Sequence, residues 1–239
     1  MRYLIYFLLL LNLHAFDSPY SNNDFKDILN KSKLQAPLSK FDPRWSVHYG
    51  KFENFSNRYF YLSDSKYMVF EMCGKKRRSE LRVKNIWKVS TKTPKILYAE
   101  VKIFPLNTER EFTFLQIHAD STLKNSPVIN KPLLRITWIK ELHNIRDHIW
   151  AIIRNSSDVR EQKYLKVDLG KREDGFTKFK IAVHNSRLYI FVNGFKKIDM
   201  DIKYWKNFYN YFKAGVYLQS KGCAKVLFKK IITKDKNEY

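Results

Sequence analysis

The sequence has no long apolar run beyond its first residues, no long helical pattern and no internal repeat. Because a helix that crosses a bilayer needs roughly 20 consecutive apolar residues, we expect no membrane span. Signatures of helix-turn-helix, zinc-finger and RNA-recognition domains are absent, so nucleic acid is not the expected partner. No metal and no cofactor is expected, because the histidines outside the motifs below lie at no spacing typical of metal sites: His48, His143, His148 and His184.

Acidic residues are scarce relative to basic ones. The 239 residues include 23 Asp and Glu against 45 Lys and Arg, which gives a formal net charge of +22. The electric field of such a charge attracts acidic polymers. Charge alone therefore allows nucleic acid, acidic polysaccharide or anionic membrane as the partner. The alternative is a basic surface that serves only solubility. Hydrophobic residues make up 44% of the chain, enough for a packed core. The length fits one β-rich domain, and we expect a monomer.

The amino terminus has the pattern of an export signal. Arg2 gives a short positive region, residues 4–13 are almost wholly apolar, and Ala15 is a small residue at which a signal peptidase can cut. The apolar run is too short for a membrane anchor. We therefore predict a signal peptide over residues 1–15 and an exported protein, either secreted or periplasmic.

Only two cysteines are present, Cys73 and Cys223. In an oxidising compartment they can form a disulfide. Each lies a few residues from one of the polar strands described below, so a bridge would tie two such strands together if they are neighbours. Two free, buried thiols are the alternative, since an unpaired cysteine packs as a small hydrophobic residue.

Beyond the signal, the chain changes its pattern once. Residues 16–45 are interpreted as loops around one short amphipathic helix at 25–34, and residues 46–239 as the main domain. The main domain alternates with the period of two typical of strands, and Asn185-Ser186 and Asn193-Gly194 mark hairpin turns. The predicted strands cover residues 59–62, 67–72, 78–83, 96–104, 111–118, 133–139, 149–154, 165–169, 176–184, 187–193, 211–219 and 225–233.

So many short strands predict an all-β fold in which two antiparallel sheets pack face to face, a sandwich or jelly roll. A long sheet of this kind curves, so its concave face would form a groove suited to an extended chain.

Three of the predicted strands are polar on one face and apolar on the other, since alternate residues of a strand share a face. The polar faces carry Arg78, Glu80 and Arg82; Gln116 and His118; and Tyr211, Lys213, Tyr217 and Gln219. The opposite faces carry Leu81, Ile117, Phe212, Ala214, Val216 and Leu218. The polar faces together would make a surface that binds a polyanion and moves protons.

These strands contain three ordered motifs, RSELR at 78–82, QIH at 116–118 and YFKAGVYLQ at 211–219. In this order they resemble polysaccharide lyase family seven, the alginate lyases. Residues 131–135, the strand ending at Asn193-Gly194 and Trp205 are similar to that family as well, so the resemblance covers the chain from about residue 41 onward. It implies a concanavalin-like β-jelly roll, in agreement with the strand pattern.

The resemblance also implies an activity, the cleavage of the 1,4 links of alginate by β-elimination, which leaves unsaturated uronate ends. A proton leaves C5, beside the sugar carboxylate, so the site must first hold that carboxylate. Arg78 and Gln116 would do so. Tyr211 would protonate the departing O4. His118 would neutralise the carboxylate or, for guluronate, act as the base.

Two further expectations follow from the resemblance. For mannuronate, Tyr211 would also serve as the base if nearby cations lower its pKa. Relatives with isoleucine at the position of Ile117 tend to accept guluronate or mixed blocks, so we expect such blocks to be preferred. Substrate binding or support is assigned to Glu80, Arg82, Lys213, Tyr217 and Gln219, with Glu80 orienting an arginine.

Several alternatives stay open. Arg78, Glu80 and Arg82 alone would suit an exposed ion-pair ladder of small energetic consequence. A noncatalytic module that binds acidic polysaccharide would need the groove without an acid and a base. A lyase acting on another polyuronate, such as glucuronan, stays closest to the main hypothesis.

Overall fold

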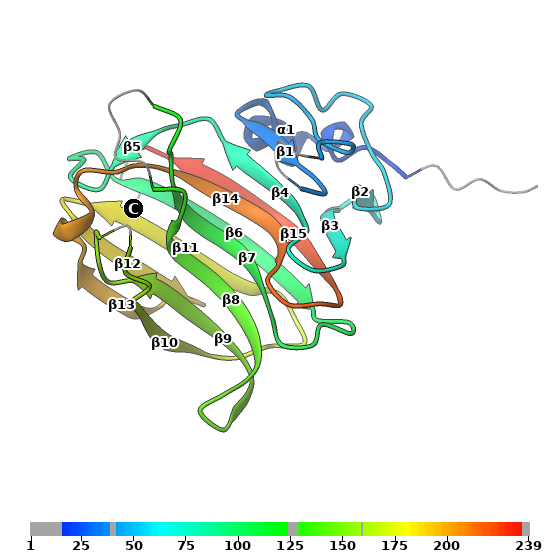
Figure 1. Cartoon of the computed structure of the whole chain (residues 1–239). Coiled ribbons are helices and arrows are strands. Elements are labelled where there is room, and N and C mark those ends of the chain that lie inside the picture. Colours follow the sequence, from blue (N-terminus) through cyan, green and yellow to red (C-terminus); the bar gives the residue numbers. More distant parts are fainter. Residues whose placement is uncertain (1–15, 39–41, 124–128, 159, 236–239) are drawn as a thin grey trace, which may run out of the picture.

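The structure, a computed structural model, describes residues 16–38, 42–123, 129–158 and 160–235, and the predicted signal peptide at 1–15 lies outside this range. The described chain folds into two antiparallel β-sheets packed face to face (Figure 1). The predicted all-β sandwich is confirmed. Among the described residues, no helix is long and apolar enough to cross a membrane.

One sheet carries all three motifs, and we refer to it as the motif sheet. Its strands follow the order β1, β4, β14, β7, β8, β9, β10, and the short β5 pairs with the start of β14. The motif strands β4, β14 and β7 are therefore direct neighbours. The bounds are β1 Ser32–Gln35, β4 Arg78–Val83, β5 Trp87–Lys88, β7 Glu111–Ala119, β8 Pro132–Leu142, β9 Ile145–Arg154, β10 Tyr164–Lys171 and β14 Tyr209–Leu218.

The second sheet has the order β13, β12, β11, β6, β15, β3, β2. The β11–β12 hairpin turns at Asn185-Ser186 and the β12–β13 hairpin at Asn193-Gly194, as predicted, and these turn residues have positive φ angles. The bounds are β2 Phe60–Ser63, β3 Tyr67–Cys73, β6 Lys95–Phe104, β11 Thr177–His184, β12 Arg187–Val192, β13 Phe195–Asp201 and β15 Cys223–Lys234.

The apolar faces of the two sheets form the core. Phe114 of β7 and Phe179 of β11 meet across the sandwich with ring centroids 5.4 Å apart. Removal of such surface from water is the main favourable term in folding. The residues predicted to point inward from the motif strands all belong to this core: Leu81, Ile117, Phe212, Ala214, Val216 and Leu218.

The amino-terminal segment differs from the prediction. Helix α1 covers only Asn23–Asn30, and Ser32–Gln35 form β1, which pairs with β4. The helix begins at Asn22, whose side chain accepts a hydrogen bond from the backbone N–H of Asp24 at 2.9 Å. After the helix, alternate residues are buried, as in a strand against a core. The predicted helix at 25–34 therefore extended too far, because residues 32–34 belong to β1.

Five short elements were not predicted. They are β1, β5, the edge strand β13, and the 3₁₀ turns η1 (Pro19–Ser21) and η2 (Lys203–Trp205). In β13 only one residue is buried, because it lies at the sheet edge, so its sequence carries little apolar alternation.

The two cysteines form a disulfide. Cys73 and Cys223 face each other across β3 and β15, in the second sheet, so the bridge does not join the motif strands directly. The bridge instead joins the β3–β4 connection to the β14–β15 connection, because Cys73 ends β3 and Cys223 begins β15. Beside it, the N–H of Gly74 donates to the carbonyl of Gly222 at 2.8 Å. The disulfide thus holds together the turns that position β4 and β14.

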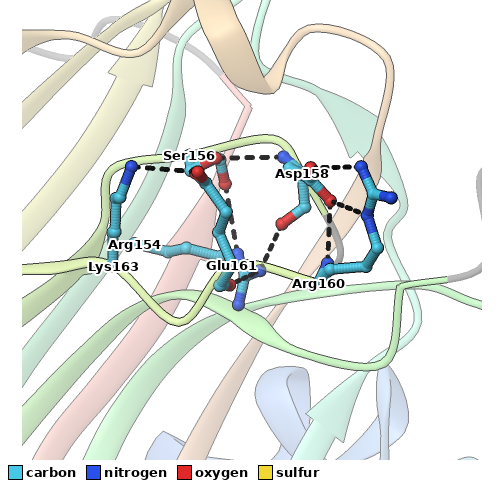
Figure 2. Close-up of polar contacts among 6 residues, drawn as sticks. All are labelled: Arg154, Ser156, Asp158, Arg160, Glu161 and Lys163. Atoms are coloured by element: carbon cyan, nitrogen blue, oxygen red, sulfur yellow. Dashed lines mark hydrogen bonds and ion pairs between the residues drawn. The ribbon is translucent and has the colours of Figure 1, made fainter.

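The connection between β9 and β10 is organised by a buried arginine (Figure 2). Arg154 is fully buried, and its guanidinium donates to the backbone carbonyls of Ser156, Asp158 and Glu161. These carbonyls satisfy a charged group that would be costly to bury without partners. The carboxylates of the loop pair instead with Arg160 and Lys163.

Candidate active site

The strand register brings the predicted site residues together. Across β14 and β7, Tyr211 is paired with His118 and Lys213 with Gln116. Across β14 and β4, Lys213 is also paired with Arg82, and Tyr217 with Arg78. Paired residues of an antiparallel sheet project on the same face, so the three motifs share one surface, as predicted.

Gly215 permits the close contact of two of these strands. Its φ angle is +139°, and a Cβ atom there would lie 2.2 Å from the carbonyl oxygen of Ser79 and 2.8 Å from the Cα of Glu80. Both neighbours are backbone atoms of β4, so a side chain would push the strands apart. The glycine of the third motif therefore keeps β14 against β4.

A cavity of about 770 Å³ lies over this part of the motif sheet. It is bounded on one side by the motif strands and on the other by the amino-terminal segment and the residues that follow β7. Its polar lining comes from Lys33, Gln35, Ser46, His48, Arg78, Arg82, Asp120, Ser121, Thr122, Asn130, Tyr211 and Lys213.

Glu80 is the central anion of the site. It is 1% exposed, and its carboxylate accepts hydrogen bonds from the Nζ of Lys213 at 2.5 Å and from the Nε2 of Gln116. The guanidinium of Arg78 lies 3.7 Å away. Glu80 was predicted to orient an arginine, but its nearer partners are Lys213 and Gln116. The exposed ion-pair ladder is excluded, because this network is buried.

Lys213 is buried as completely as its partner, with 2% of its surface exposed. Loss of hydration lowers the pKa of Lys213 to about 8, although the carboxylate of Glu80 acts in the opposite direction. Lys213 was assigned to substrate binding or support. Its ammonium group instead already has an internal partner.

Arg82 and Tyr211 form a second cluster with Asp120. Arg82 donates to the Asp120 carboxylate at 2.7 Å, and its guanidinium carbon lies 4.0 Å from the centroid of the Tyr211 ring. Burial raises the pKa of Tyr211 to about 12, and Arg82 offsets only part of this effect. The condition under which Tyr211 would serve as a base, a pKa lowered by nearby cations, is therefore not met, because desolvation outweighs the effect of Arg82.

His118 is held as a neutral imidazole. Burial, together with the nearby charge of Lys213, lowers its pKa to about 3. Its Nδ1 lies 2.8 Å from the carbonyl oxygen of Ala119. A carbonyl only accepts hydrogen bonds, so Nδ1 carries the hydrogen and Nε2 carries the free lone pair. The Tyr211 hydroxyl is 3.3 Å from the same Nδ1, so it has no acceptor there and keeps its own hydrogen available.

The remaining predicted residues border this centre. The Arg78 guanidinium carbon lies 4.6 Å from the centroid of the Tyr217 ring. The Gln219 amide donates to the hydroxyl of Thr113 on β7. Among the described residues, no group of His, Cys, Asp or Glu side chains is arranged to hold a metal ion.

Comparison with known proteins identifies the family. A family model described as alginate lyase matches residues 27–235. An alginate lyase of Photobacterium sp. (strain ATCC 43367) is 32% identical over 237 residues, covering 84% of this chain and 81% of that protein. The chain belongs to the alginate lyase family.

Solved structures give the same assignment. The alginate lyase AlyC3 in complex with dimannuronate is similar with a TM-score of 0.82 and 28% identity, covering 92% of this lyase and 95% of that chain. The family 7 alginate lyase A1-II′ in complex with product (GGG) has a TM-score of 0.73 at 20% identity, covering 91% and 99%. The lyase therefore has the jelly-roll fold of polysaccharide lyase family 7, as the motifs had indicated.

Several cavity residues of the lyase were not predicted, among them the charged Lys33 and Asp120 and the amide Gln35. Asp120 follows His118 by two residues, so its position on the same face was available from the strand period. Lys33 and Gln35 flank buried Leu34, but Lys33 fell inside the predicted helix at 25–34 and Gln35 in the loop after it. Recognition of this alternation as strand would have identified both.

Removal of the central anion is expected to destabilise the lyase. In Glu80→Gln, Lys213 stays buried without a counter-charge, so the free energy of unfolding should fall by about 3 kcal/mol or more. The matched control is Glu141→Gln, which removes an exposed ion pair with Arg146 and should change stability by less than about 1 kcal/mol. Denaturant unfolding measures both. Equal losses in the two variants would show that Glu80 has no special structural role.

Proposed function

We propose that this lyase cleaves alginate by β-elimination and that the cavity over the motif sheet holds the uronate that loses its C5 proton. The proposal is supported chiefly by one observation: the phenol of Tyr211, which lines the cavity together with Arg78, keeps its proton and lies 3.3 Å from the neutral imidazole of His118 on the neighbouring strand. A noncatalytic binding module would not need this acid and base pair.

Arg78 and Gln116 would hold the sugar carboxylate. One N–H of the Gln116 amide is engaged by Glu80, which leaves the second N–H free to donate to a substrate. The guanidinium of Arg78 offers a planar pair of donors that matches a carboxylate. Donors fixed before the substrate arrives stabilise the negative charge that develops when C5 loses its proton.

His118 would then remove the C5 proton through Nε2, and Tyr211 would donate its proton to the departing O4. Tyr211 with a pKa near 12 is suited to hold a proton until O4 takes it. The pKa of His118 is low in the free enzyme, and the negative charge of a bound uronate would raise it toward a useful value.

This division of roles favours one type of sugar. In guluronate the C5–H and O4 lie on opposite faces of the ring, so a base and a separate acid are required. In mannuronate the two lie on the same side and Tyr211 alone would have to be deprotonated first, which its raised pKa opposes. We therefore propose a preference for guluronate-containing or mixed blocks, although AlyC3 was solved with dimannuronate.

Export is also proposed. The amino-terminal pattern at 1–15 supports it, and so does the disulfide between Cys73 and Cys223, since disulfides persist mainly in oxidising compartments. An exported lyase would meet its polymer outside the cytoplasm.

Digestion of block-defined alginates tests the reaction and the block preference together. Unsaturated ends, measured by ultraviolet absorbance, should form faster from guluronate-containing or mixed blocks than from mannuronate blocks. Tyr211→Phe removes only the hydroxyl oxygen, so it should fold and bind polymer yet lose more than about 100-fold in kcat.

Two kinds of result would contradict these proposals. No unsaturated ends from any alginate, or release only from another polyuronate such as glucuronan, would refute the proposed substrate. A Tyr211→Phe variant that keeps most of its turnover would refute the role of the phenol.

The pH dependence of kcat/KM reports the ionisation of the free enzyme. His118 must be neutral, and with a pKa of about 3 it is already neutral throughout the range above about pH 5. The profile should therefore lack an acid limb centred on the usual histidine pKa of about 6.5. Tyr211 stays protonated well above pH 10, so the first alkaline loss should come from Lys213, near pH 8. An acid limb centred near 6.5 would contradict this state of His118.

A further inference from the structure

A line of paired residues, all polar or charged except Ile152, crosses the motif sheet. Pairing connects Lys33 to Arg82, Arg82 to Lys213, Lys213 to Gln116, Gln116 to Arg135, Arg135 to Ile152, and Ile152 to Lys166. Neighbouring strands lie about 4.8 Å apart, and paired residues share a face. The five cations of this line, which runs perpendicular to the strands, are called the cation row: Lys33, Arg82, Lys213, Arg135 and Lys166.

The inner and outer members of the cation row differ in their partners. Arg82 is paired with Asp120 at 2.7 Å and Lys213 with Glu80 at 2.5 Å. Within the part of the chain that the structure describes, Lys33, Arg135 and Lys166 form no ion pair with a carboxylate. The protein therefore neutralises the centre of the row and leaves its two ends cationic.

At one end, Lys33 lies at the cavity wall on β1. Its Nζ is 5.2 Å from the centroid of the Tyr49 ring, which restricts the side chain. Gln35, on the same face of β1, has a buried Oε1 with no hydrogen-bond partner. Partial burial and the charge of Arg82 lower the pKa of Lys33, so an anion bound in the cavity would relieve an unfavourable environment.

At the other end, Arg135 is directly beside Gln116 in the register. Its Nε is buried without a hydrogen-bond partner, and its guanidinium carbon is 5.7 Å from the centroid of the Tyr164 ring. Ile152, the next residue in the row, belongs to a small apolar cluster with Trp150, against which Tyr164 packs. A cation next to an apolar surface fits a sugar acid, because the cation can bind the carboxylate and the apolar surface can pack against the C–H face of the ring.

We propose that the polyuronate lies along the cation row, across the strands, and that Lys33 and Arg135 bind the carboxylates of sugars on opposite sides of the cleaved link. This inference rests on the proposed function and names the residues that set the position of the polymer. It assigns roles to two positions outside the catalytic group, one of them in the amino-terminal segment.

The test uses the full chain with the single substitutions Lys33→Met and Arg135→Met, which keep much of the apolar stem and remove the charge. Lys180→Met is the matched control, because Lys180 lies on β11 in the second sheet and its Nζ is 5.4 Å from the Phe191 ring, much as Lys33 lies near Tyr49. Thermal unfolding confirms that each variant is folded. The substrate is a uronate hexasaccharide labelled at one end.

Each substitution in the row should raise KM roughly 3- to 10-fold with a smaller change in kcat, and the control should match the wild type. Loss of Lys33 should shift the cleaved link toward one end of the hexasaccharide and loss of Arg135 toward the other, because each removes the hold on one side. Unchanged cleavage positions, or shifts in the same direction, would overturn the proposal while leaving the lyase activity intact.

If the wild type cleaves no polyuronate, the proposed function fails. A direct binding measurement then tests whether the cation row binds the polymer. Titration of the same hexasaccharide should then show weaker binding by Lys33→Met and Arg135→Met but not by Lys180→Met. Equal affinities of all four proteins would refute the row as a binding surface.

Discussion

The site depends on one buried carboxylate. Glu80 lies where β4, β14 and β7 meet, and the cost of burying its charge is offset only if Lys213 and Gln116 are both in place. These partners come from the two other motif strands, so one requirement for charge balance links all three motifs. The amide of Gln116 and the guanidinium of Arg78 are thereby fixed around a common point before any substrate is present.

The fold supports this network at a distance. Gly215 lets β14 approach β4 without a clash, and the Cys73–Cys223 disulfide closes the connections through which these strands leave the motif sheet. Burial then sets the protonation states that elimination needs: a neutral His118 and a protonated Tyr211. The positive charge of the cation row plays a different part. Its central members, Arg82 and Lys213, are already paired with carboxylates, and its members without carboxylate partners lie toward its ends.

Much of this architecture could be predicted from alternation alone. The period of two placed Arg78, Gln116, His118 and Tyr211 on polar faces, and the Asn-rich turns gave the hairpins of the second sheet. The order of the strands within the sheets is not contained in the local pattern, so neither the disulfide pairing nor the contact of Glu80 with Lys213 could be decided in advance. Residues 32–34 were misassigned to the helix because a short alternating run next to a helix also fits one more helical turn.

The pKa of Tyr211 shows a second limit of prediction. A list of nearby cations suggests a lowered value, but the value depends on the balance between those charges and the depth of burial, which only the packed structure gives. The same holds for Lys213: its sequence position allowed substrate binding or support, and only the packed structure shows that its ammonium group is paired with Glu80. Residue identity predicted the members of the site, whereas packing determined which of them remain free to act on a ligand.

A crystal structure of Tyr211→Phe with a bound uronate oligosaccharide tests the central claim most directly. The account predicts one sugar carboxylate in contact with both Arg78 and Gln116, while the Gln116 amide still donates to Glu80 and the Nε2 of His118 faces C5 of the same sugar. A carboxylate bound elsewhere, or a Gln116 amide turned away from Glu80 in the complex, would contradict it.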